Sequence, residues 1–143
     1  MKKLCVALMG VLVIVTGCGS ELSTLDIKKA SNAIEQSLKD MTVVEDETLE
    51  SVYGLDLSLM DEYIFKDNKD GDIYAIIKTS NKVEVKEDME GYFEKIKGFS
   101  EAYAPERMDI LEDRLEKEIG DYLIYIVAED ADDIYDDVID TME

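Results

Sequence analysis

The sequence predicts an α+β domain: a four-stranded, mainly antiparallel sheet with helices packed mostly on one face. Two observations lead to this prediction: the order of the elements along the chain, and the residue patterns that mark each element. After residue 60 the chain alternates in the order hairpin, helix, hairpin, helix, with strand-forming runs beside turn residues and apolar side chains at helical spacing between them. An N-terminal helical segment precedes this series. Strands and helices in this order are typical of an α+β architecture.

The first predicted element of the domain is an amphipathic helix. Apolar residues recur at spacings of three and four over residues 27–41, which is typical of one buried helix face. We expect Ser23 to cap this helix, with Asp26 at the third helical position completing a capping-box pair. A second, shorter helix is predicted over residues 45–53, and Gly54 suits the left-handed position that ends it.

The first predicted hairpin follows a single helical turn that Asp56 caps. Its strands are the β-rich runs 63–65 and 73–77, and residues 67–71, rich in Asp, Asn and Gly, form the turn between them. This turn resembles a calcium loop in composition. With Gly71 at the sixth position, however, the first and twelfth positions hold no carboxylate, so we interpret it as a solvated turn.

A long helix and a second hairpin complete the predicted sheet. Apolar spacing predicts the helix from about residue 85 to 99, and Pro105 marks the break after it. A loosely patterned run at 111–119 then leads into the apolar stretch 122–128, which is typical of a central strand buried on both faces. Residues 130–143 are predicted to form the last helix.

The composition excludes several classes of function. The 143 residues include 35 acidic and 15 basic side chains but no histidine, which removes histidine-dependent catalysis and histidine-bearing metal sites. The formal charge of −20 argues against binding nucleic acid, since basic groups must replace the counterions of the phosphates. The sequence holds no glycine-rich phosphate loop and no nucleophile motif, so we predict neither nucleotide binding nor a cofactor.

The N-terminus predicts secretion and a lipid anchor. The basic start Met1-Lys2-Lys3 precedes an apolar run over residues 4–15, which is too short to span a bilayer and typical of a signal-peptide core. The following Thr16-Gly17-Cys18 resembles a bacterial lipobox. This resemblance implies a thioether-linked diacylglycerol on Cys18, cleavage after Gly17 and acylation of the new amino terminus.

These features divide the chain into three parts. We expect residues 1–17 to be a cleaved signal peptide, residues 18–22 a lipid-anchored tether, and residues 23–143 a single α+β domain on the extracytoplasmic face of the cell membrane. Cleavage removes Lys2 and Lys3 and takes the formal charge from −20 to −22. Because the tether is short, the domain is expected to sit close to the membrane.

Several short motifs also occur together in a known family. They are Val52-Tyr53-Gly54-Leu55-Asp56 leading into Asp61-Glu62-Tyr63, Tyr103-Ala104-Pro105-Glu106, and Gly120-Asp121-Tyr122 before the apolar strand and Glu129-Asp130-Ala131-Asp132. With the lipobox they make the chain similar, over nearly its whole mature length, to the domain-of-unknown-function 4358 family of small lipoproteins of Gram-positive bacteria. The resemblance implies the same location and a single domain, and it implies no catalytic residue.

The last predicted helix lies in the most acidic part of the chain. Residues 98–143 hold 16 acidic and three basic side chains. Five aspartates share the helix face opposite its apolar residues: Asp132, Asp133, Asp136, Asp137 and Asp140. Like charges four residues apart destabilise a helix by roughly 0.2–0.5 kcal/mol per pair. The face is either a patch for calcium, magnesium or a basic partner, or a solvated surface that keeps the protein soluble.

The leading hypothesis is a non-enzymatic lipoprotein that binds another envelope protein or an envelope ligand. The alternative is a surface cation-binding protein that acts through the five aspartates, and a third possibility is a carboxylate-only hydrolase of wall polysaccharide. Lys28 and Lys29 adjoin the tether, whereas the acidic helix lies at the other end of the chain. We therefore expect the final helix to point away from an anionic membrane and to leave Asp140 exposed.

Overall fold

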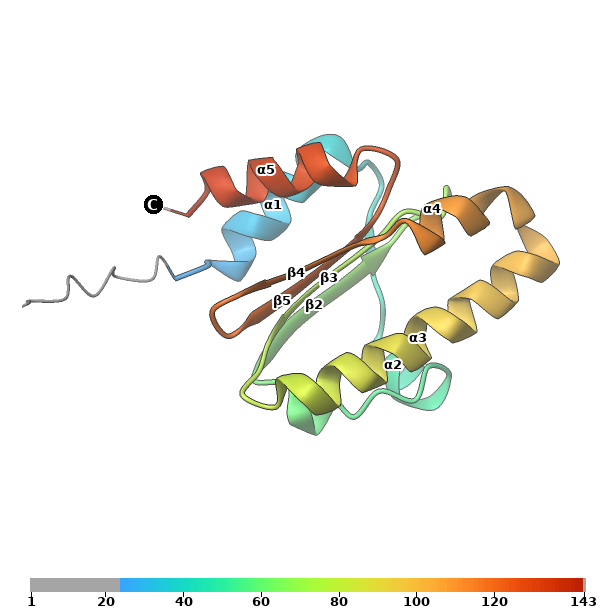
Figure 1. The fold of residues 1–143 in the computed structure, drawn as a ribbon, viewed down its shortest axis with the longest axis horizontal. Helices are drawn as coiled ribbons and strands as arrows, with labels where there is room; N and C mark the ends of the chain where they lie inside the picture. Colours follow the sequence, from blue (N-terminus) through green and yellow to red (C-terminus); the bar gives the residue numbers. More distant parts are fainter. Residues whose placement is uncertain (1–23, 143) are drawn as a thin grey trace, which may run out of the picture.

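The computed structural model describes residues 24–142, which form one α+β fold built on an antiparallel sheet (Figure 1). The predicted signal peptide, Cys18 and Ser23 lie outside the described residues. The sheet has five strands in the order β1-β2-β3-β5-β4, and each neighbouring pair is antiparallel. The predicted α+β class and antiparallel pairing are confirmed.

The order of hairpin, helix, hairpin and helix after residue 60 is as predicted. In chain order the elements are α1 (Ile27–Ser37), β1 (Thr42–Val43), α2 (Asp46–Ser51), η1 (Leu57–Leu59), β2 (Glu62–Asp67), β3 (Ile73–Lys78), α3 (Lys82–Tyr103), η2 (Pro105–Arg107), α4 (Met108–Glu112), β4 (Leu115–Ile119), β5 (Tyr122–Val127) and α5 (Ala131–Asp140). The loosely patterned run at 111–119 divides into the last two residues of α4 and, after Asp113 and Arg114, strand β4.

The prediction of four strands is wrong because it missed β1. This strand contains only Thr42 and Val43, both exposed, which pair with Asp67 and Lys66 at the edge of β2. Two residues are too few to show the alternation of apolar and polar side chains by which a half-buried strand is recognised. The short strand covers part of the otherwise open edge of β2, which limits pairing with other chains there.

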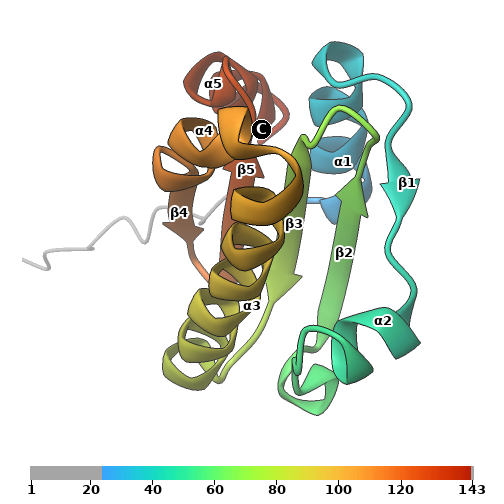
Figure 2. The same cartoon turned by 90° about the vertical axis from the view of Figure 1, so that its right-hand side faces the viewer.

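Helices cover both faces of the sheet, so the prediction that they lie mostly on one face is also wrong. The side chains of β3 and β5 alternate between two separate apolar cores. Helices α1 and α5 cover one face, whereas α3, with α2 and α4 beside it, covers the other (Figures 1 and 2). The unbroken apolar run of β5 requires this arrangement, since a strand buried on both faces needs an apolar layer on each side.

The core beneath α1 and α5 is mainly aliphatic, and a polar network around Tyr74 joins it to α1. The hydroxyl of Tyr74, which is fully buried, donates to Oε1 of Glu35 at 2.6 Å and lies 2.7 Å from Oγ of Ser31. Lys66 of β2 forms an ion pair with the same carboxylate. Burial by itself raises the pKa of Glu35, but hydrogen bonds from Lys66 and Tyr74 outweigh it and hold the pKa below its ordinary value. The charged carboxylate therefore connects α1, β2 and β3.

The core beneath α3 contains a cluster of aromatic rings among its aliphatic side chains. The ring of Tyr92 lies 5.7 Å from that of Phe65 and 5.0 Å from that of Phe93, measured between centroids, and Phe93 lies 5.6 Å from Tyr125. The guanidinium of Arg114 lies 4.5 Å from the centroid of the Phe93 ring. Tilted and edge-to-face pairs at these distances add to the burial of the rings themselves. This cluster fixes α3 across β2, β3 and β5.

The cap of α1 differs from the prediction. The helix begins after Asp26, whose Oδ1 accepts hydrogen bonds from the backbone N–H groups of Lys28 and Lys29 at 2.9 and 3.1 Å. Asp26 is therefore the cap and not the third helical residue, so the assignment of the cap to Ser23 is wrong. The backbone of Asp26 is extended, as expected of a capping residue, which lies just outside the helical conformation.

The sheet has two ends that differ in what surrounds them. Leu25, Lys78 and the β4–β5 turn at Gly120 lie together at the end where the described chain begins, here called the entry end. The far end holds the β2–β3 turn at Gly71 and Ala128, which follows β5. Helices α1 and α3 run from the entry end to the far end, and α5 runs back (Figure 1). None of the helices within residues 24–142 has the length and apolarity needed to cross a membrane.

Replacement of Ile124 or Ile126 with Ala should lower the free energy of unfolding by about 2–5 kcal/mol, because each change leaves a cavity in a fully buried layer. Urea unfolding measures the effect. The control is Ile139→Ala on α5, where the side chain is 38% exposed and a change of no more than about 0.5 kcal/mol is expected. An unchanged urea midpoint for both core variants would contradict the central position of β5.

Candidate functional site

Two hollows that share Glu129 open at the far end of the sheet. The first, of about 410 Å³, lies between the end of α1, the β2–β3 turn, Arg107 and the start of α5. The second, of about 550 Å³, lies between α4 and the start of α5. We call them the Arg107 hollow and the Asp132 hollow, and together the acidic end.

Carboxylates line both hollows. Those of the Arg107 hollow are Asp70, Asp72, Glu129, Asp130 and Asp133. Those of the Asp132 hollow are Asp109, Asp113, Glu129 and Asp132. They come from the β2–β3 turn, from α4 and the residue after it, from the connection between β5 and α5, and from the first turn of α5. Carboxylates gathered in a concave surface focus a negative potential, so this end attracts cations and basic side chains.

The β2–β3 turn places two of these carboxylates. Oδ1 of Asn68 accepts hydrogen bonds from the backbone N–H groups of Asp70 and Asp72, each at 3.0 Å. Gly71 has a φ of +87°, in the left-handed region that glycine adopts without strain. A Cβ atom at Gly71 would lie 2.9 Å from Nε of Arg107. Glycine is therefore required both for the turn and for the close approach of the arginine.

Arg107 forms an ion pair within its hollow. Its Nη2 donates to Oδ1 of Asp72 at 2.9 Å, and the two side chains are only 17% and 19% exposed. Its Nε is buried and has no hydrogen-bond partner among the described residues. Because Asp72 neutralises the guanidinium, the remaining carboxylates leave the hollow with a negative charge.

The structure separates the five predicted aspartates of the last helix into two groups. Asp132 and Asp133, in the first turn of α5, line the two hollows. Asp136, Asp137 and Asp140 are exposed along the rest of the helix. The predicted face therefore exists, but only its first two members belong to the acidic end.

The expected orientation of the last helix needs correction. Helix α5 packs beside α1 and runs back to the entry end, so Asp140 lies at the same end of the molecule as Lys28 and Lys29 (Figure 1). Distance along the chain misled the prediction, because the fold returns its last helix to where the domain begins. Only the start of α5 is remote from the entry end.

Metal binding by these carboxylates stays a prediction. Within residues 24–142, no group of three acidic or cysteine side chains is arranged to hold a metal ion. Burial raises the pKa of Asp67, as a catalytic acid requires, but this residue lines neither hollow. What the geometry shows is an acidic, concave surface.

Sequence reasoning missed most of the acidic end. Arg107, Asp109 and Asp113 follow a helix break and have no local pattern that marks them. The one usable signal was Gly71 between two aspartates, which was interpreted as a solvated turn. The topology, and not any local motif, brings these segments together.

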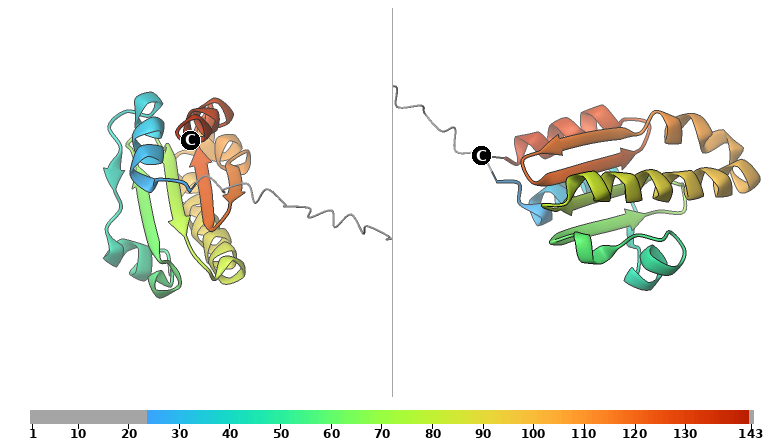
Figure 3. Two further views of the ribbon diagram at one scale, coloured as in Figure 1. Left: turned by 90° about the vertical axis from the view of Figure 1, so that its left-hand side faces the viewer. Right: turned by 60° about the horizontal axis from the view of Figure 1, so that its bottom comes forward.

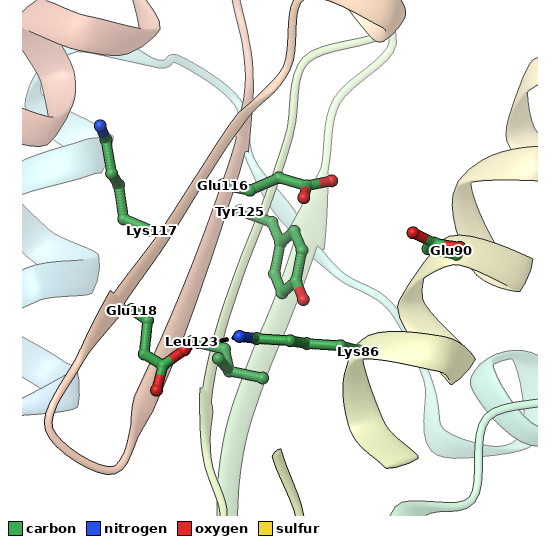
Figure 4. Close-up of a pocket in the computed structure, with 7 residues that line it drawn as sticks. All are labelled: Lys86, Glu90, Glu116, Lys117, Glu118, Leu123 and Tyr125. Carbon is green, nitrogen blue, oxygen red and sulfur yellow. Dashed lines mark hydrogen bonds and ion pairs between the residues drawn. The ribbon is translucent and has the colours of Figure 1, made fainter. Parts of the chain in front are cut away.

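A smaller hollow of about 220 Å³ lies between α3 and β4 (Figure 4). Lys86 reaches from α3 to Glu118 on β4 at 2.6 Å, above Leu123 and Tyr125 of β5. Hydrogen bonds from Lys82 and Lys86 lower the pKa of Glu118 to about 2. These contacts hold the edge strand to the helix, so we interpret this hollow as part of the packing of β4.

A family model with the description "Domain of unknown function (DUF4358)" matches residues 34–128, about two thirds of the chain. The match runs from the last four residues of α1 to the residue after β5, so it contains the whole sheet and α3. It agrees with the family that the motifs of the sequence indicate. No curated protein and no solved structure shows a significant match.

Replacement of Gly71 with Ala should lower the free energy of unfolding by about 1–3 kcal/mol, because alanine is strained at this φ and its methyl group meets Arg107. The matched control is Gly91→Ala in α3, where a Cβ meets nothing within 4 Å and helix propensity should raise stability by about 0.5–1 kcal/mol. Urea unfolding compares the two. Equal effects at both positions would show that the turn does not need glycine.

Proposed function

Because the chain belongs to the DUF4358 family, whose description assigns no activity, we propose a function from its own residues. The protein is an extracytoplasmic lipoprotein, anchored to the cell membrane through Cys18, that acts as a non-enzymatic binding module of the cell envelope. The observation that carries this proposal is the lipobox-like Thr16-Gly17-Cys18 directly after a signal-peptide core.

The difference between the two ends of the sheet supports an anchored role. Five residues separate Cys18 from Thr24, so the extended chain between them reaches no more than roughly 22 Å and an anchor would hold the entry end near the membrane. The acidic end lies at the opposite end of the sheet. Repulsion between the acidic end and anionic lipids, effective over about 8–10 Å at physiological salt, favours the same orientation, and Asp140 at the entry end acts against it. The acidic end would then be presented to other envelope components.

The chemistry of the acidic end supports binding more than catalysis. Its negative charge fits a basic partner, and electrostatic attraction of this kind speeds association. A carboxylate-only hydrolase needs one carboxyl that stays protonated near neutral pH beside a second that stays charged. The carboxyl that burial favours in its protonated form, Asp67, stands apart from both hollows.

Replacement of Cys18 with Ala should abolish labelling of the protein by an alkyne fatty-acid analogue in growing cells, because the thioether anchor needs the thiol. The matched control is Cys5→Ala, which removes the other cysteine of the chain and should leave labelling unchanged. Gel fluorescence after coupling to a dye measures the label. Labelling that survives in the Cys18 variant would contradict the anchor.

A cation-binding surface protein is the second candidate, favoured by Asp132 and Asp133 in the two hollows. Under the main proposal, calorimetry with calcium or magnesium should show no saturable binding below millimolar concentration. The comparison is the protein with Asp132→Asn and Asp133→Asn. Saturable micromolar binding that these changes remove would favour the cation-binding function instead.

A further inference from the structure

Strand β4 is the last strand on one side of the sheet, and its outer edge is open (Figure 2). A connection of two residues joins it to β5, so the flanking Ile119 and Tyr122 exchange backbone hydrogen bonds. Along an antiparallel pair, such bonded positions alternate with positions whose N–H and C=O groups point the other way. The backbone groups of Glu116 and Glu118 therefore point away from β5.

These four backbone groups have no partner within residues 24–142. Both residues are exposed, and no turn or loop of the described chain forms a backbone hydrogen bond with either of them. The opposite edge of the sheet differs, since β1 pairs with part of β2 there. An edge with unpaired N–H and C=O groups is a template for one more strand.

Salt bridges hold the two carboxylates of β4 toward α3. Nε of Arg114 donates to Glu116 at 2.8 Å, and Lys86 of α3 pairs with Glu118 at 2.6 Å (Figure 4). Charged side chains often protect an edge strand from pairing. Here they are bound within the chain, on the face of the sheet that α3 covers, so they fix β4 in place and leave its outer backbone accessible.

The other face of the sheet carries an apolar surface beside the open edge. Nζ of Lys117 lies 5.6 Å from the centroid of the Tyr135 ring, which places this part of α5 near β4. Ile139 follows Tyr135 by one turn on the same side of α5 and is 38% exposed. The other side of α5, at Ile134, faces the end of α1 at Leu38. Tyr135 and Ile139 therefore border the open edge of β4.

A second copy of this chain does not suit the edge. An antiparallel pair of two β4 strands would set the outward groups of Glu116 and Glu118 in one copy against those in the other. Glutamate would then lie directly opposite glutamate, and like charges at opposed positions destabilise a sheet. The formal charge of −20 on each chain adds to this repulsion.

We propose that the open edge of β4 binds an extended segment of another protein as an additional strand of the sheet. The unpaired backbone groups of Glu116 and Glu118 specify this occupant, because an extended polypeptide presents N–H and C=O groups at the matching spacing. Alternate side chains of the segment would be apolar and would pack against Tyr135 and Ile139. The inference rests on the proposed function only in placing the partner in the cell envelope.

The first measurement is photo-crosslinking in native cells, with benzoylphenylalanine in place of Lys117 in the full chain. This position is exposed in the middle of β4, where an aromatic residue suits a strand. The matched control has the crosslinker in place of Val43, which is 57% exposed in β1 at the opposite edge of the sheet. We expect a yield about tenfold above the control, and mass spectrometry identifies the crosslinked segment.

The second measurement compares Glu116→Pro with Glu116→Ala in the chain that carries the crosslinker at position 117. Both changes remove the carboxylate, but only proline removes the outward N–H. Proline is tolerated in an edge strand where the N–H faces solvent, so the ladder between β4 and β5 should be kept. The yield should be about tenfold lower with proline than with alanine, because a carbonyl of the partner loses its donor.

The third measurement leaves the protein unchanged, so it decides the matter even if proline disturbs folding. The crosslinked segment is synthesised as a fluorescent peptide, and anisotropy measures its binding to the purified protein. N-methylation of every second amide removes the donors along one edge of the peptide. Methylation of one alternate set should weaken binding at least tenfold, whereas methylation of the other set should leave binding unchanged.

A crosslink to another protein, with a peptide that responds to only one of the two methylated sets, is the result that the proposal predicts. Equal yields at positions 117 and 43, a crosslink to a second copy of this chain, or binding that neither methylated set weakens would overturn it. Fatty-acid labelling of Cys18 is scored separately, so failure of the anchor and failure of strand addition are distinguishable.

Discussion

Strands β3 and β5 lie side by side in the middle of the sheet, with Ile76 opposite Ile124, and nearly every side chain along both is buried. Because alternate side chains point to opposite faces, burying these two strands requires an apolar layer on each face of the sheet. Helices α1 and α5 supply one layer and α3 supplies the other. The last helix must therefore return beside α1, and α3 must run the length of the sheet. The ends of the sheet stay uncovered, and the carboxylate-bearing segments meet at one of them.

The far end combines two features that the packing of the sheet leaves unused. The carboxylates of the Arg107 and Asp132 hollows converge where the β2–β3 turn meets the start of α5. The last turns of α3 extend beyond the strands at the same end (Figure 3, right panel), and the side chains of Phe99 and Tyr103 there are exposed. The carboxylates gathered at this end favour the approach of basic partners, to which charge gives orientation and rate. The entry end, by contrast, is where the chain leads toward the lipobox.

Local sequence patterns predicted the elements that a contiguous run of residues marks. They failed for an element too short to show such a run and for contacts between residues distant in the sequence. The apolar run of β5 and the Asp/Asn/Gly turn before β3 were recognised because each is a contiguous pattern. Strand β1 has two exposed residues and no pattern to detect. Apolar spacing shows which side of a helix is buried but not which face of the sheet it covers, so the placement of α1 and α5 opposite α3 could not be predicted. The ion pair of Asp72 and Arg107 spans 35 residues, and only the folded topology brings them together.

We propose that the molecule is held at its entry end and presents its far end to the envelope. Depth measurement by spin labels on the lipidated protein in anionic vesicles tests this most directly, with labels on Lys28→Cys and Asp109→Cys, both exposed positions. We expect the label at position 28 to respond to a relaxing agent dissolved in the lipid, and the label at position 109 to respond only to a soluble one. Equal depths, or a deeper label at position 109, would contradict the proposed orientation.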